Sequence, residues 1–214
     1  MYLSCLLLDP RDRRVRKVLS NRYELHRTLL FPYPELTREE IGLLYRVEPT
    51  LTHELQPVKI LAQTQVAPEW HSLEPARLPV LSVETKEFHL TPKPGERFYF
   101  RLEGNPTVRR NNGDYKGKRV ELRTIEEQEQ WLVNKAARHG FRVINLETTD
   151  LGKVVSQKAE DDLRHTITHQ AVLYQGLLEV TDIEKFVDAV AEGIGAAKGF
   201  GFGLLSLAGL RMEK

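Results

Sequence analysis

The sequence contains very little cysteine. Cys5 is the only one in 214 residues, which excludes a disulfide framework and a zinc site built on cysteines. Cys5 lies in the apolar run 3–8, and nothing near it in the sequence would activate a thiolate. We therefore expect it to be a small core residue.

A long apolar run is also absent. No stretch approaches the roughly 18 residues that a membrane-spanning helix requires, and Met1–Leu8 lacks the basic region and cleavage site of a signal peptide. We therefore expect a cytosolic protein.

Net charge of either sign is nearly absent. The 31 Lys and Arg residues and 30 Asp and Glu residues give a formal net charge of +1. A role in nucleic-acid binding therefore has to rest on where the basic residues lie. The length suits one large domain or two domains of about 100 residues each.

Basic residues are nevertheless concentrated in two stretches. The first lies on an expected short helix at 11–17 and is opposed only by Asp12; the second is a turn-rich loop at 107–119. Both compositions fit a phosphate-binding surface, and both also fit a solvated face. The basic residues concerned are Arg11, Arg13, Arg14, Arg16, Lys17, Arg109, Arg110, Lys116, Lys118 and Arg119.

A helix that Asn21 can cap carries three side chains that could take part in catalysis. Tyr23, His26 and Arg27 occur at positions i, i+3 and i+4 and therefore share one face. A phenol, an imidazole and a guanidinium side by side are suited to acid–base chemistry on a phosphodiester. A single helical histidine is otherwise usually a surface or packing residue, so both interpretations stay open at this point.

The most unusual stretch is GIGAAKGFGFG at 193–203. Five glycines allow the backbone to approach a phosphate or a base closely, because no Cβ stands in the way. The stretch fits neither a P-loop nor a dinucleotide fingerprint, whose glycines follow a strand and open a helix. A helix C-cap with a bulge would explain only Gly193 and Gly195.

The order around this stretch is helix, glycines, strand. Thr181 and Glu184 form a T-x-x-E capping box for the helix that leads in, and a strand at about 203–208 leads out. Together with Lys198 inside it, the stretch is predicted to make a close contact with a ligand.

The predicted elements give an α+β fold of two tandem ferredoxin-like (RRM-like βαββαβ) domains. The proline-rich section 67–94 separates them, so we expect domains at 1–92 and 93–214. The first half has strands at 2–8, 43–48, 58–65 and 80–90. The second half has helices near 125–138 and 183–194 and strands near 98–102, 141–147, 151–158, 164–170, 171–180 and 203–208.

A metal site is not predicted. His165 and His169 would be one turn apart in a helix, but the residues between them favour a strand. Strand positions i and i+4 stand about 13 Å apart and cannot chelate one ion.

Several motifs together resemble CasE, the CRISPR-associated endoribonuclease family of the type I-E Cascade complex. They are the MYLS start, the YELHR helix at 23–27, FxFRLxxNP at 98–106 and GIGxxKxxGxGLLS at 193–206. The match covers both ends and the middle of the chain. It is weakest at about 50–80, 107–118 and 145–165, where no residue role is carried over.

The resemblance implies an endoribonuclease of two ferredoxin-like domains that needs neither metal nor another cofactor. Such an enzyme cleaves the repeat hairpin of precursor CRISPR RNA, leaves a 2′,3′-cyclic phosphate and remains bound as a Cascade subunit. By position His26 is the catalytic histidine, acting as general base or general acid. Tyr23 would hold the nucleophile or the phosphate, and Arg27 would stabilise charge.

The resemblance also implies that the glycine stretch lies against the RNA close to the scissile phosphate. The basic stretches then become candidate contacts to the A-form stem. A non-catalytic RNA-binding paralogue and a small-nucleotide-binding protein remain the alternatives. The candidate RNA contacts are Arg27, Arg13, Arg14, Arg16, Lys17, Arg109, Arg110, Lys118, Arg119, Gly195, Lys198, Gly199 and Gly201.

Overall fold

The computed structural model describes residues 1–48, 56–73, 77–109, 117, 119–160 and 163–210. By its internal contacts the chain divides into two compact units. The first comprises residues 1–89, 155–168 and 198–201, and the second comprises 90–154, 169–197 and 202–214. The sequence-based boundary between residues 92 and 93 stays a prediction.

The first unit is built on an antiparallel sheet with the strand order β2-β3-β1-β4, which is the order of a ferredoxin-like sheet. Burial alternates along β1, where Leu6 and Leu8 are fully buried. Cys5 lies on the other face and is only half-buried. The prediction that Cys5 is a core residue is therefore wrong. The strands are β1 (Tyr2–Leu8), β2 (Leu44–Val47), β3 (Val58–Thr64) and β4 (Val80–Glu87).

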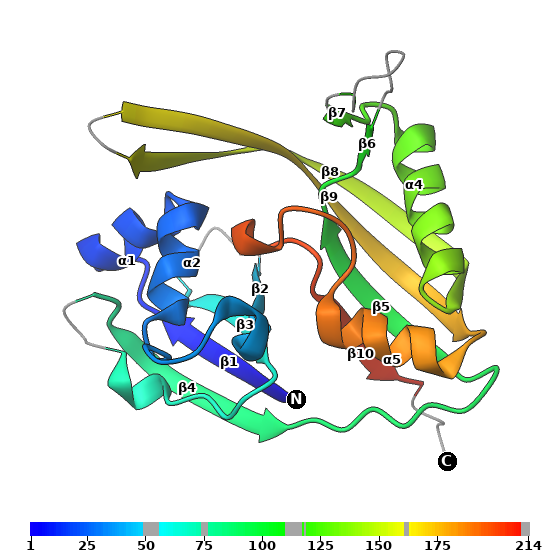
Figure 1. Ribbon diagram of the computed structural model, residues 1–214, viewed down its shortest axis with the longest axis horizontal. Coiled ribbons are helices and arrows are strands. Elements are labelled where there is room, and N and C mark those ends of the chain that lie inside the picture. Colours follow the sequence, from blue (N-terminus) through cyan, green and yellow to red (C-terminus); the bar gives the residue numbers. More distant parts are fainter. Residues whose placement is uncertain (49–55, 74–76, 110–116, 118, 161–162, 211–214) are drawn as a thin grey trace. The chain divides into compact units, whose positions relative to one another are not determined.

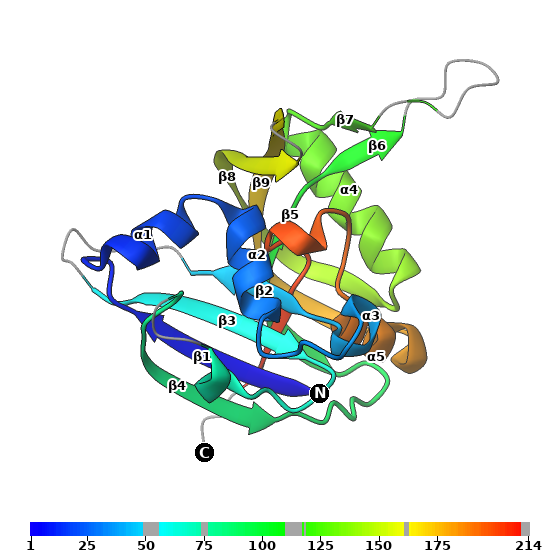
Figure 2. The same ribbon diagram turned by 60° about the vertical axis from the view of Figure 1, so that its left-hand side comes forward.

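Helices α1 and α2 cover one face of this sheet (Figures 1 and 2). The predicted cap of α2 is confirmed, because Asn21 Oδ1 accepts a hydrogen bond from the Tyr23 backbone N–H at 3.2 Å. The helices of the first unit are α1 (Arg13–Leu19), α2 (Arg22–Leu30) and α3 (Arg38–Ile41). Their apolar side chains join those of the sheet in one core that includes Leu6, Leu8, Val15, Leu25, Leu29, Ile41 and Ile60.

Between β3 and β4, where a ferredoxin-like unit has its second helix, the described residues form one 3₁₀ turn, η1 (Trp70–Ser72). The Trp70 side chain is buried in the same core, and its Nε1–H donates to Ser4 Oγ at 2.8 Å. This hydrogen bond anchors the connection to β1.

The second unit has the complete order βαββαβ, with its sheet ordered β10-β5-β9-β8. Trp131 of α4 stacks on Tyr174 of β9, and Phe186 of α5 stacks on Phe98 of β5. The predicted α+β fold of two ferredoxin-like units is confirmed. The elements are β5 (Arg97–Gly104), an inserted hairpin of β6 (Thr107–Arg109) and β7 (Arg119–Glu121), α4 (Ile125–Arg138), β8 (Phe141–Glu160), β9 (Leu163–Val180), α5 (Ile183–Glu192) and β10 (Leu205–Gly209). Residues 155–168 of β8 and β9, and the 3₁₀ turn η2 (Lys198–Phe200), belong to the first unit. Among the described residues, no helix has the length and apolar character to cross a membrane.

The prediction of four strands between 141 and 180 is wrong, because the chain forms two long paired strands, β8 and β9 (Figure 1). The polar run before Gly152 resembles a turn, and the Gly152 N–H does bond to Asp150 Oδ1 at 2.7 Å. Strand β8 nevertheless continues through it. Ladder hydrogen bonds thus hold a strand together where its apolar alternation stops.

The capping box predicted for α5 is also wrong by one residue. The N-cap is Asp182, whose Oδ1 accepts from the Lys185 backbone N–H at 3.2 Å. The Thr181 backbone N–H instead donates to the Gly140 carbonyl at 2.8 Å. Asp182 is also held by the Lys185 ammonium, and these hydrogen bonds lower the pKa of its carboxyl.

Candidate active site

Helix α2 carries His26 on its inner side, where the side chain is only 9% exposed. The imidazole stacks on the ring of Tyr45 from β2, with centroids 6.0 Å apart and an interplanar angle of 22°. Its Nε2 faces Gly199, because a Cβ placed on that glycine would stand 3.4 Å from this nitrogen. A glycine at this position therefore leaves the space in front of Nε2 open.

Burial lowers the pKa of His26 from its usual 6.5 to about 4, and the positive charge of Arg38 contributes in the same direction. Among the described residues, Nδ1 of His26 has no hydrogen-bond partner. The imidazole is therefore neutral near pH 7 and has one ring nitrogen able to accept a proton.

This lowered pKa predicts acid sensitivity of the fold. Because the folded pKa lies below the unfolded one, the contribution of His26 to stability is complete above about pH 6.5 and is lost as the pH falls toward 4. Between pH 7 and pH 5 the free energy of unfolding should drop by about 2 kcal/mol through this group.

Urea unfolding of the wild type and of His26→Ala at both pH values measures this contribution. We expect the pH-dependent loss to be smaller in the variant by about that amount. An equal loss in both proteins would show that His26 does not titrate in this range.

The segment 198–201 is tied to α2 and β2 by polar contacts. Arg22 Nη1 donates to the Phe200 carbonyl at 3.1 Å, and Tyr45 Oη donates to the Arg22 carbonyl at 2.9 Å. The Tyr45 hydroxyl also lies 3.5 Å from the Gly199 carbonyl, and the ring of Tyr23 is tilted against that of Phe200, with centroids 6.4 Å apart. Tyr45 thus supports both the imidazole and the glycine backbone that it faces.

The glycines of this stretch approach side chains of the protein itself. Gly201 has φ +80°, and a Cβ there would meet the Tyr45 ring at 2.9 Å. Gly195 has φ +91°, and its Cβ would meet Trp131 at 3.0 Å. Packing within the chain therefore requires glycine at these two positions, which is a different reason from the ligand contact that we expected. Their contact with RNA stays a prediction.

Gly201→Ala should destabilise the protein by about 2–5 kcal/mol, from the left-handed backbone and the overlap with Tyr45. Thermal melting measures the change, and Gly209→Ala is the matched control, because Gly209 is exposed and a Cβ there meets nothing within 4 Å. A melting temperature unchanged in Gly201→Ala would contradict the packing role.

The basic stretch on α1 lies at the surface, where acidic neighbours pair with part of it. Arg14 pairs with the N-cap Asp12 at 2.6 Å, which lowers the pKa of that carboxyl to about 2. Arg16 Nη1 donates to the Arg11 carbonyl at 3.0 Å. The side chains of Arg13 and Lys17 are exposed.

The remaining predicted cations lie in different places. Arg27 is exposed, pairs with Glu24 at 3.4 Å and lies 6.0 Å from the centroid of the Tyr23 ring. Lys198 is half-buried at the start of η2. Arg109 and Arg119 stand opposite each other on β6 and β7. Arg110 and Lys118 lie outside the described residues.

The two histidines considered for a metal lie on strand β9, as expected. His169 Nδ1 lies 3.1 Å from Asn105 Nδ2, and its ring packs edge-on against Phe202. Within the described ranges, no group of three His, Cys, Asp or Glu residues is placed to hold a metal ion.

A sequence profile of the CRISPR-associated protein family matches residues 1–209. The chain belongs to this family. It is 36% identical to the CRISPR-associated endoribonuclease Cse3 of Thermus thermophilus, over 97% of this chain and 100% of the relative. It is 31% identical to the CRISPR system Cascade subunit CasE of Escherichia coli, over 98% of this chain and 100% of that protein.

Solved structures of the CRISPR-associated protein family match the fold as well. The structure of CRISPR endoribonuclease Cse3 bound to a 19-nucleotide RNA superposes with a TM-score of 0.83 at 35% identity, covering 97% of this chain and 100% of the other. The resemblance to CasE is therefore confirmed.

Proposed function

We propose that the protein is an endoribonuclease that cleaves the repeat stem-loop of precursor CRISPR RNA and then remains bound as a subunit of Cascade. Membership of the family and full-length similarity to a CRISPR endoribonuclease and to a Cascade subunit support this function. We place this activity in the cytoplasm. The main structural support for this chemistry is that the imidazole of His26 is neutral and that its Nε2 faces Gly199.

Cleavage begins when the 2′-oxygen of the nucleotide before the scissile bond attacks phosphorus. The bond from phosphorus to the 5′-oxygen breaks, which leaves a 2′,3′-cyclic phosphate and a 5′-hydroxyl. One proton leaves the 2′-hydroxyl and one reaches the 5′-oxygen. The neutral His26 of the free protein is in the state of a proton acceptor. A bound phosphate would raise its pKa and favour the donor state.

Neighbouring side chains have supporting roles in this proposal. Tyr23, one turn before His26, offers a phenol to orient the nucleophile or the phosphate, and Arg27 offers a positive charge to the phosphorane. Tyr45 is a positioning residue, because it stacks on His26 and bonds to the Arg22 carbonyl. None of these steps requires a metal ion.

A cleavage assay with EDTA on the repeat stem-loop tests this function. We expect cut RNA with a cyclic phosphate end and a shifted hairpin in a binding gel. A non-catalytic RNA-binding paralogue would shift the hairpin without cutting it. A small-nucleotide-binding protein would do neither, and either result would contradict the proposal.

A further inference from the structure

The far ends of β8 and β9 form a two-stranded ribbon (Figure 1). The pairing of β9 with β5 covers Val172–Glu179, and beyond that range the sheet neighbour of β9 among the described strands is β8. A two-stranded ribbon by itself is marginally stable in water. Residues 155–168 of this ribbon nevertheless belong to the compact first unit. We therefore looked for the contacts that hold the ribbon to this unit.

The side chain of Asn21 makes such a contact. Its Nδ2 donates to the Gln157 carbonyl at 2.8 Å, and its Oδ1 accepts from the Gln157 backbone N–H at 3.4 Å. In an antiparallel strand, the N–H and the carbonyl of one residue point to the same side. Both groups of Gln157 therefore point away from β9, at the free edge of β8. The Asn21 amide pairs with this edge as a neighbouring strand would.

The packing around this contact is loose. A cavity of about 690 Å³ lies between this part of the ribbon and helices α1 and α2, and Arg14, Val18, Val155 and Gln157 are among the residues that line it. Val155 is 51% exposed although it borders this cavity. Apolar burial therefore contributes little on this side of the ribbon, which makes the hydrogen bonds from Asn21 important for its position.

The same side chain also begins helix α2. Asn21 Oδ1 is the N-cap acceptor for the Tyr23 backbone N–H, and His26 follows one turn later on the helix. Because one oxygen accepts from both Tyr23 and Gln157, the position of the ribbon edge affects where α2 begins. The orientation of the Tyr23 and His26 side chains depends in turn on the position of this helix.

We propose that Asn21 is a positioning residue for cleavage, whose side-chain amide joins the start of α2 to the free edge of β8 and thereby holds Tyr23 and His26 in the geometry that the reaction needs. The proposal rests on the proposed function. It gives Asn21 a role beyond that of a helix cap, since a cap needs only the oxygen of this side chain.

Three variants separate the two roles of Asn21. Asn21→Ser keeps an oxygen that caps a helix about as well, but it lacks the amide that donates to Gln157. Asn21→Asp keeps the cap and the length of the side chain, but a carboxylate cannot donate to a carbonyl. Asn21→Ala loses both the cap and the contact. Asn134→Ser is the matched control, because Asn134 is an exposed asparagine on α4.

The measurements are the single-turnover cleavage rate at protein concentrations that saturate the repeat stem-loop, the melting temperature, and hydrogen exchange at residues 155–158. We expect Asn21→Ser and Asn21→Asp to lower the saturated rate by about tenfold, the equivalent of one hydrogen bond that positions a catalytic group. Exchange at 155–158 should become faster in both. Their melting temperatures should stay close to that of the wild type and above that of Asn21→Ala, and the control should match the wild type throughout.

Two results would overturn the proposal. A wild-type rate in both Asn21→Ser and Asn21→Asp, with a loss only in Asn21→Ala, would leave Asn21 as a helix cap alone. Unchanged exchange at 155–158 in all three variants would show that Asn21 does not hold the ribbon. The exchange measurement needs no RNA, so it is independent of the proposed function, which a wild-type protein that fails to cut the stem-loop would contradict.

Discussion

His26→Ala is expected to lower the single-turnover rate of hairpin cleavage by about 10²–10⁴-fold, the range for one positioned acid–base group. The affinity for the hairpin should change little, because the buried imidazole offers RNA only one nitrogen beside Gly199. Rapid-quench cleavage and polarisation on the same preparation measure both quantities.

Tyr23→Phe provides the comparison for this variant. Its loss of rate should be smaller, because a hydroxyl that orients the substrate costs less to remove than a group that transfers a proton. A larger loss for Tyr23→Phe than for His26→Ala would reverse their roles. A wild-type rate in His26→Ala would remove His26 from the mechanism.

Gly199→Val is expected to reduce cleavage by about 10²-fold, close to the loss of His26 itself. The backbone of Gly199 is outside the left-handed region, so a side chain is tolerated there, and its Cβ would lie 3.4 Å from His26 Nε2. The valine methyl groups would then cover this nitrogen. Melting should remain near that of the wild type, in contrast with Gly201→Ala.

The control for Gly199→Val is Gly209→Val, where the added side chain meets open space. Cleavage rate, hairpin affinity and melting temperature are measured for both variants. Normal cleavage in a folded Gly199→Val protein would show that substrate reaches His26 from another side or that Nε2 does not act.

The two-unit fold could be predicted from the sequence because most elements carry a local pattern. The alternation in 2–8 and the helical period of 125–138 each predict one element directly. The number of strands between 141 and 180 could not be predicted, because the continuity of β8 and β9 depends on their pairing with each other and only weakly on local alternation.

Part of the candidate site could be predicted in the same way, since helical spacing alone places Arg27 beside Tyr23, 6.0 Å from the centroid of its ring. Tyr45 could not, because it meets His26 only when β2 packs beside α2. The sequence shows that the glycines at 195 and 201 are unusual, but Trp131 and Tyr45, which require glycine at these positions, are far away in the sequence. Distant contacts of this kind leave no local pattern.

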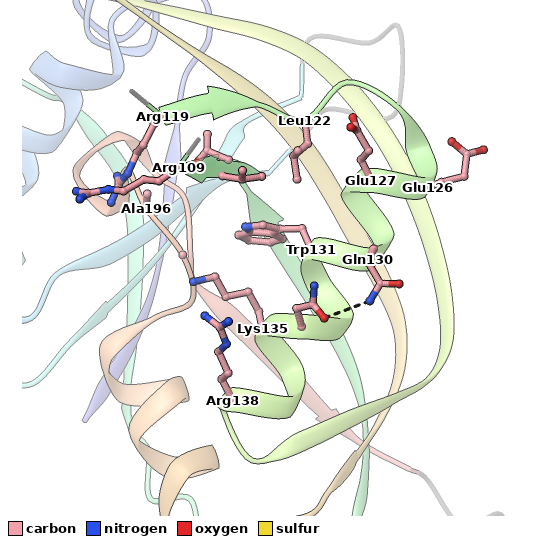
Figure 3. Close-up of a pocket in the computed structure, with 14 residues that line it drawn as sticks. Arg109, Arg119, Leu122, Glu126, Glu127, Gln130, Trp131, Lys135, Arg138 and Ala196 are labelled. Atoms are coloured by element: carbon pink, nitrogen blue, oxygen red, sulfur yellow. Dashed lines mark hydrogen bonds between the residues drawn. The ribbon is translucent and has the colours of Figure 1, made fainter. Parts of the chain in front are cut away.

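The cavity that α4 and the β6–β7 hairpin line in the second unit (Figure 3) could likewise be predicted only in part from the sequence. Lys135 and Arg138 follow Trp131 on one helix, so their shared side could be expected from spacing. That Arg109, Arg119 and the chain at 195–196 close the same cavity follows only from the fold.

In the proposed mechanism, the 2′-hydroxyl of the RNA attacks the scissile phosphate and His26 transfers a proton. The most direct measurement compares the repeat hairpin with the same hairpin carrying a single 2′-deoxy nucleotide immediately before the scissile phosphate, both in EDTA. We predict cleavage of the first to a 2′,3′-cyclic phosphate and none of the second. Cleavage of the deoxy hairpin at a comparable rate would contradict the account.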